Sequence, residues 1–117
     1  MDGVFVKKRK ILLLKRNVKP YKGFWHLIGG HVKANESLKE ALKREFKEET
    51  NLDIEVGEII DARIEETLDR TKVIVALQVT SAHGEIKLNF ENIEYGWFSK
   101  TPQNSSYNYS KYLSNSL

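Results

Sequence analysis

One segment, residues 37–51, carries the signals of a complete amphipathic helix and constrains the fold more than any other. Ser37 and Glu40 form the Ser-x-x-Glu pattern of a capping box, which satisfies free backbone N–H groups where a helix starts. Apolar residues then recur at helical spacing, at Leu38, Ala41, Leu42 and Phe46. Asn51 tolerates the left-handed conformation that ends many helices. We therefore predict a helix that runs to about Thr50.

The segments on either side of this helix have the composition of strands. Ile11–Leu14 is a continuous apolar run, and Lys72–Thr80 is rich in the β-branched residues that favour strands. Shorter extended segments are expected at 4–6, 25–28, 54–64, 86–88 and 94–99, and a short helix within 107–117. This order of elements predicts a layered α/β domain.

Size and composition exclude several classes of protein and leave a small, single-domain protein as the expectation. The chain has 117 residues, the usual size of one domain, and a net charge of +3, which suits anionic substrates without indicating a nucleic-acid binder. It contains no cysteine, which excludes disulfides, thiolate zinc sites and cysteine nucleophiles. Because no apolar run approaches the length of a membrane span, we expect a cytoplasmic protein that does not bind membranes.

Three glutamates share one face of the predicted helix. Glu45, Glu48 and Glu49 stand at i, i+3 and i+4, where like charges repel, and near the helix C-terminus, where the macrodipole disfavours anions. Such a cluster on a surface helix is usually a solvated acidic face. A bound divalent cation would remove the repulsion, and oxygen ligands without His or Cys indicate Mg²⁺ or Mn²⁺ rather than zinc.

The spacing around this cluster resembles the Nudix box, G-x5-E-x7-R-E-U-x-E-E-x-G-U, in which U is a bulky apolar residue. The matching residues are Gly30, Glu36, Arg44, Glu45, Phe46, Glu48, Glu49 and Leu52. Asn51 stands where the box has its second glycine, and Asn35 and Ile28 replace a Gly and a Pro often found in this region. None of these departures changes a charged group, so we expect no loss of activity.

The resemblance implies a fold and a reaction. The fold would be a Nudix-type α/β/α sandwich with a mixed central sheet, one domain over residues 1–117 with its box at 30–52. The reaction would be Mg²⁺-dependent hydrolysis of a diphosphate linkage in a nucleoside diphosphate joined to a variable group X, with Mn²⁺ as a substitute. Metal ions that neutralise phosphate oxygens and acidify a water molecule address the main barriers to this reaction.

The resemblance also implies roles for the box residues. The Gly30 carbonyl would bind metal together with Glu48 and Glu49. Glu45 would either bind metal or deprotonate the attacking water. Arg44 would hold a carboxylate of the cluster in place, and Glu36 would pair with that arginine.

Residues outside the box are weaker candidates. Glu91 is expected to be a further metal ligand or base, and Glu94 could contact a nucleobase edge, although both could be ordinary loop acids. Arg16 could touch a substrate phosphate, Trp25 could stack on a base, and His31 could lie near the substrate. The plain alternatives are a solubilising charge, a core aromatic and a loop residue, respectively.

The sequence says less about the substrate. Members that cleave ADP-ribose typically have a proline downstream of the box, and here none occurs between Leu52 and Pro102. We therefore favour a nucleoside triphosphate pyrophosphohydrolase of the MutT-like type that acts on a small-molecule nucleotide. The alternatives are hydrolysis of dinucleoside polyphosphates, nucleotide sugars or RNA 5′ ends, or a non-catalytic nucleotide-binding module. A homodimer is possible, since dimers are frequent in the family.

Overall fold

A computed structural model describes residues 1–114 and arranges them in two four-stranded sheets and two helices. The elements in this part of the chain are β1 (Asp2–Val4), β2 (Val6–Lys7), β3 (Lys10–Arg16), β4 (Trp25–His26), β5 (Ile28–Gly29), α1 (Leu38–Thr50), β6 (Asp53–Glu66), β7 (Thr71–His83), β8 (Asn92–Phe98) and α2 (Ser110–Ser114). The last three residues of the segment 107–117, in which a short helix was expected, lie outside the described residues. None of the described helices is long and apolar enough to cross a membrane.

The first sheet has the strand order β5-β1-β7-β6. β1 runs parallel to β7, whereas β5 and β6 pair antiparallel with their neighbours, so this sheet is mixed as predicted. In the second sheet β3 pairs antiparallel with β2, β4 and β8. The predicted strand Lys72–Thr80 is the inner strand β7 of the first sheet.

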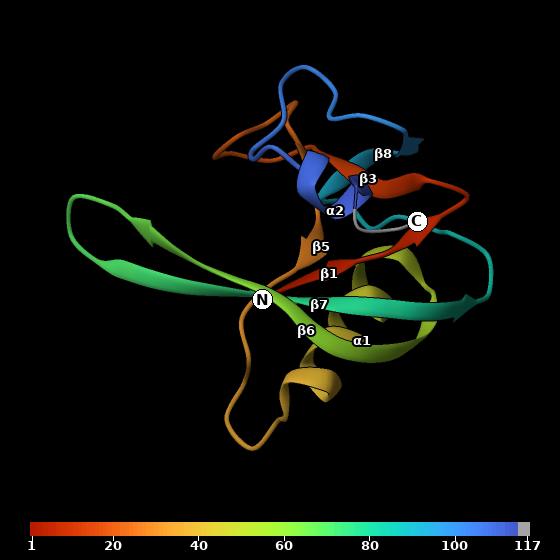
Figure 1. Cartoon of the computed structure of the whole chain (residues 1–117), viewed down its shortest axis with the longest axis horizontal. Coiled ribbons are helices and arrows are strands. Elements are labelled where there is room, and N and C mark those ends of the chain that lie inside the picture. Colours follow the sequence, from red (N-terminus) through yellow and green to blue (C-terminus); the bar gives the residue numbers. More distant parts are fainter. Residues whose placement is uncertain (115–117) are drawn as a thin grey trace.

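β3 explains why the chain contains an unbroken apolar run. Leu12 and Leu14 belong to the same core cluster as Phe46 of α1, whereas Leu13 belongs to a second cluster that contains Tyr109 beside α2. A strand that is buried on both faces reads as a continuous apolar sequence rather than an alternating one. The strands therefore form a layer between α1 and α2 (Figure 1), and the predicted α/β/α sandwich is confirmed.

The predicted helix limits are also confirmed. The Glu40 backbone N–H donates to Ser37 Oγ at 3.1 Å, and the Ser37 N–H donates to Glu40 Oε1 at 2.9 Å, which completes the capping box. At the other end Asn51 adopts φ 68°, and its N–H donates to the Lys47 carbonyl. Asparagine thus fills the left-handed position where the box has glycine.

The strand predicted at residues 86–88 is wrong. Residues 85–89 form no regular element, and the Lys87 N–H donates to the Thr50 carbonyl at 2.9 Å, where it satisfies a free group at the end of α1. Ile86 and Leu88 still pack against the core, which explains their apolar character without strand pairing. The β6–β7 hairpin is longer than predicted, and its tip projects away from the rest of the molecule (Figure 1).

Candidate active site

A cavity of about 1180 Å³ brings together residues from α1, the loop before it, β7 and the segment before β8. The predicted site residues that line it are Arg16, Gly30, His31, Arg44, Glu45, Glu48, Glu49 and Glu91. Glu36 is not part of this lining, but it accepts a hydrogen bond from Arg44, which is. A volume of this size accommodates a nucleotide-sized ligand.

Glu49 is the most unusual group in the cavity. Its side chain is buried, and Oε1 accepts a hydrogen bond of 3.3 Å from Asn92 Nδ2, whereas Oε2 is buried without a hydrogen-bond partner among the described residues. Burial, reinforced by the charges of Glu45 and Glu91, raises the pKa of Glu49 to about 8, and hydrogen bonds from Asn92 and from the Gly29 backbone offset only part of this rise. An unpartnered buried oxygen costs about 1–3 kcal/mol, so this position favours a cation or a proton.

Glu45 lies directly against the backbone of Gly30. A Cβ atom at Gly30 would stand only 2.5 Å from Glu45 Oε1, so any residue other than glycine would displace this carboxylate. The Gly30 carbonyl, a predicted metal ligand, here accepts a hydrogen bond of 2.8 Å from the amino group of Met1. A cation bound by this carbonyl would therefore compete with an ammonium group.

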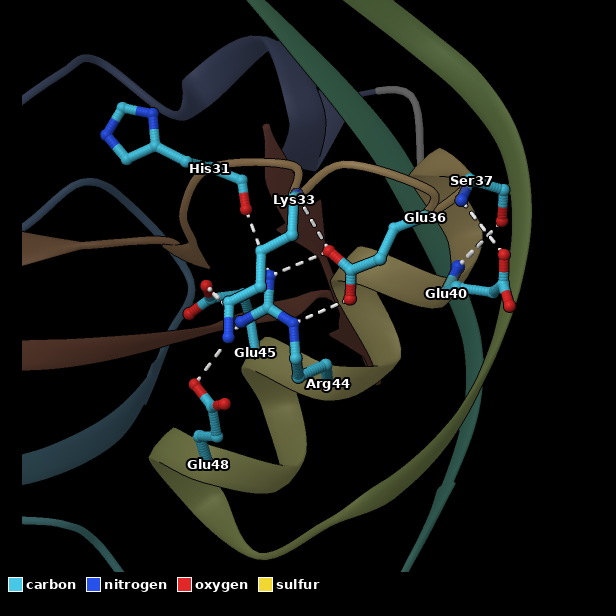
Figure 2. Close-up of polar contacts among 8 residues, drawn as sticks. All are labelled: His31, Lys33, Glu36, Ser37, Glu40, Arg44, Glu45 and Glu48. Atoms are coloured by element: carbon cyan, nitrogen blue, oxygen red, sulfur yellow. Dashed lines mark hydrogen bonds and ion pairs between the residues drawn. The ribbon is translucent and has the colours of Figure 1, made fainter.

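Arg44 connects the loop before α1 to the glutamates of the helix (Figure 2). Its guanidinium forms a two-point contact with Glu36 at 2.7 and 3.0 Å and also donates to the His31 carbonyl at 3.0 Å. On the helix side it donates to Glu45 at 3.0 Å and to Glu48 at 3.4 Å. The hydrogen bonds from Arg44, and then from the Lys33 backbone, lower the pKa of Glu36 to about 2.

The donor set suits a hard divalent cation, although the carboxylates do not yet converge. Within residues 1–114 no three acidic or histidine side chains are close enough to hold an ion as they stand, and Arg44 contacts both Glu45 and Glu48. The buried Oε2 of Glu49 nevertheless has no partner and lies near two further carboxylates. Carboxylate and carbonyl oxygens without sulfur or imidazole ligands fit Mg²⁺ or Mn²⁺.

The four predicted substrate contacts divide into two pairs. Arg16 and His31 line the cavity, and Arg16 Nε also donates to the Pro20 carbonyl at 2.6 Å. Trp25 and Glu94 lie outside the lining. Trp25 packs edge-to-face on Phe98 in the second core cluster. On the surface, Glu94 Oε1 lies 4.0 Å from Lys15 Nζ.

Other cavity residues escaped sequence reasoning. Arg63, Arg70 and Lys72 of the β6–β7 hairpin line the wall, and the hydrogen bond from Asn92 reaches Glu49. An isolated surface cation or asparagine carries no motif, and the contact between residues 49 and 92 joins positions 43 apart in the chain. Only the alternation of charged residues along β6 and β7 could have indicated that basic side chains of this hairpin line the cavity.

Comparison with known proteins agrees with this geometry. The NUDIX domain family model matches residues 3–101. An ADP-ribose pyrophosphatase from Methanocaldococcus jannaschii is 50% identical over 52 residues, which cover 44% of this chain and 31% of that protein. A CTP pyrophosphohydrolase from Escherichia coli is 34% identical over 79 residues, which cover 67% of this chain and 58% of that protein.

Solved structures show the same fold. The crystal structure of a MutT NUDIX hydrolase from Burkholderia pseudomallei superimposes with a TM-score of 0.85 at 23% identity and covers 99% of this chain and 94% of that one. The chain spans 31% and 58% of the lengths of the two curated relatives described above. Because the family model covers most of the sequence, including the box that carries the glutamates, this chain belongs to the Nudix family.

Proposed function

We propose that this protein is a Mg²⁺-dependent hydrolase that cleaves the diphosphate linkage of a nucleoside diphosphate joined to a group X, with one Nudix domain over residues 1–117. The observation that carries the proposal is the buried, unpartnered Oε2 of Glu49 beside Glu45 and Glu91. A fold that buries a carboxylate oxygen without a partner needs a compensating charge, which a divalent cation supplies. Nudix hydrolases generally use divalent metal ions.

The chain's residues divide the work of such a reaction. Glu45, Glu48, Glu49, Glu91 and the Gly30 carbonyl would hold the metal, which neutralises phosphate oxygens and acidifies water when it is bound. Either Glu45 or Glu91 would accept the proton of the attacking water. Outside this ligand set, Arg44 and Glu36 would fix the carboxylates and the loop through their two-point ion pair.

Cations around the cavity support a substrate with several phosphates. Arg16, Lys33, Arg63, Arg70 and Lys72 line the cavity that also contains the glutamates. Relatives carry the names CTP pyrophosphohydrolase and nucleoside triphosphatase. We therefore favour a nucleoside triphosphate, which would be split into a monophosphate and pyrophosphate.

ADP-ribose is the second candidate. The relative that is 50% identical over 52 residues is named an ADP-ribose pyrophosphatase, and 44% of this chain takes part in that match. The missing downstream proline argues against this substrate. The two candidates release different products, because ADP-ribose would yield AMP and ribose 5-phosphate without pyrophosphate.

Product analysis tests both the reaction and the substrate. We expect Mg²⁺-dependent release of pyrophosphate from at least one nucleoside triphosphate, with little turnover in EDTA and a kcat/KM above that for ADP-ribose. Glu49→Gln should lower kcat/KM at least ~100-fold. Glu66→Gln, on the hairpin outside the cavity lining, is the matched control and should retain wild-type turnover. Full activity of the Glu49→Gln variant would disprove the metal-ligand role of Glu49.

A further inference from the structure

We infer that His26 and Asn92 form a positioning pair that sets the orientation of the Glu49 carboxylate and thereby its affinity for a divalent cation. The inference rests on the proposed function, because it concerns the metal ligand named there. The three residues come from β4, β8 and α1 and meet only in the folded chain. His26 and Asn92 both lie outside the box at residues 30–52.

The hydrogen bonds run in one direction from the histidine to the glutamate. His26 Nδ1 lies 2.7 Å from the Leu27 carbonyl, and His26 Nε2 lies 2.8 Å from Asn92 Oδ1. The Asn92 Oδ1 atom can only accept, so a ring proton on Nε2 is donated to it. The amide oxygen of Asn92 is thereby held toward the ring, which leaves its Nδ2 to donate to Glu49 Oε1 at 3.3 Å.

The backbone of β8 brings Asn92 into this position. Lys15 pairs with Glu94 and Arg16 pairs with Asn92, so the register shifts by one residue and Ile93 is left without a partner on β3. Such bulges redirect side chains and are frequent next to active sites. Asn92 is only 4% exposed, and burying an amide costs free energy unless it is hydrogen-bonded. A residue that served packing alone would be apolar here.

The consequence for Glu49 is a difference between its two oxygens. Asn92 occupies Oε1 with a neutral donor, while Oε2 stays buried and unpartnered. Glu45 and Glu48, by contrast, contact the Arg44 guanidinium, with which a metal ion would have to compete. Glu49 Oε2 is thus a buried carboxylate oxygen of α1 that a cation could reach without displacing an arginine. Residues that orient a metal ligand in this way typically change metal affinity 10–100-fold when they are removed.

Binding of Mn²⁺ alone, measured by the EPR signal of the free ion, tests the pair without turnover. Asn92→Leu should weaken Mn²⁺ binding by ~10–100-fold. His26→Leu, which frees the amide to rotate, should weaken it by ~3–10-fold, and His26→Gln, which keeps an N–H donor, should stay within about twofold of wild type. Asn108→Leu, an exposed asparagine that caps α2, is the control and should bind like wild type.

Thermal unfolding in EDTA separates positioning from a purely structural role. A structural role would lower the melting temperature without changing the Mn²⁺ affinity of the folded protein. Wild-type affinity of Asn92→Leu would overturn the inference, as would equal affinities of His26→Leu and wild type. The His26 variants carry the test if Asn92→Leu does not fold. A wild-type protein that binds no Mn²⁺ would instead overturn the proposed function, and the inference with it.

Discussion

Replacing Glu49 with glutamine should stabilise the metal-free protein at alkaline pH while it removes the stabilisation by metal. Glu49 has its pKa raised from 4.5 to about 8 in the fold, chiefly by burial. At a pH between the unfolded-state pKa of 4.5 and the folded-state pKa of about 8, the folded state retains a proton that the unfolded state has lost. The free energy of unfolding therefore falls as pH rises, and the full penalty is reached once pH passes the folded pKa.

The size of the effect follows from the same values. One pKa unit corresponds to 1.36 kcal/mol, so a rise from 4.5 to about 8 amounts to at most roughly 5 kcal/mol. Glutamine at this position still buries a polar amide, which reduces the expected gain to between about 2 and 5 kcal/mol at pH 9. Well below pH 4.5 the carboxyl is protonated in both states, and the two proteins should be nearly equally stable.

Urea unfolding in EDTA at pH 5, 7 and 9, followed by tryptophan fluorescence, measures this difference directly. Glu48→Gln is the matched control, because Glu48 is 51% exposed and its removal should change stability by less than about 1 kcal/mol at every pH. Added Mg²⁺ should stabilise wild type but not Glu49→Gln. Parallel stability curves for wild type and Glu49→Gln across this pH range would refute the reasoning.

Three further substitutions test other parts of the site. Gly30→Ala places a Cβ 2.5 Å from Glu45 Oε1, so kcat/KM should fall at least ~100-fold while urea unfolding shows a loss below about 2 kcal/mol; unchanged turnover would contradict this. Arg44→Lys cannot reproduce the two-point contact with Glu36 and should lose about 1–3 kcal/mol of stability along with most activity. Wild-type stability and activity of this variant would show that the two-point contact is not needed for either. Asn51→Ala keeps a Cβ at φ 68° but loses the short polar side chain that makes this conformation tolerable and that donates to the Glu85 carbonyl, so it should cost about 1 kcal/mol in urea unfolding. Asn51→Gly, which has no Cβ at this φ, should stay closer to wild type, and equal stabilities of the two variants would show that the left-handed cap contributes nothing.

The sequence by itself determined the features that depend on local pattern. The capping box and apolar spacing of residues 37–51 set both ends of α1, because backbone hydrogen bonds and helical periodicity are short-range properties. The run Ile11–Leu14 indicated a fully buried strand for the same reason. The spacing from Gly30 to Leu52 was sufficient to indicate the family and the glutamate cluster.

Local pattern failed where a segment's role depended on distant partners. Ile86 and Leu88 alternate like a strand, yet their segment packs against the core and satisfies the end of α1. For Trp25 the sequence left base stacking and core packing open, and its packing on Phe98 outside the cavity lining agrees with the core alternative. Apolar and aromatic residues report that a side chain is buried without reporting against which element.

Only the tertiary structure distinguished the glutamates from one another. Glu48 and Glu49 are neighbours of the same type, yet Glu48 is half exposed beside Arg44 while Glu49 is buried against Asn92 with one oxygen unpartnered. This difference arises because α1 presents one face to the sheets and β8 supplies a residue 43 positions away. The electrostatics of a carboxylate depend on its burial and its neighbours, and both are properties of the packed fold rather than of the helix that carries it.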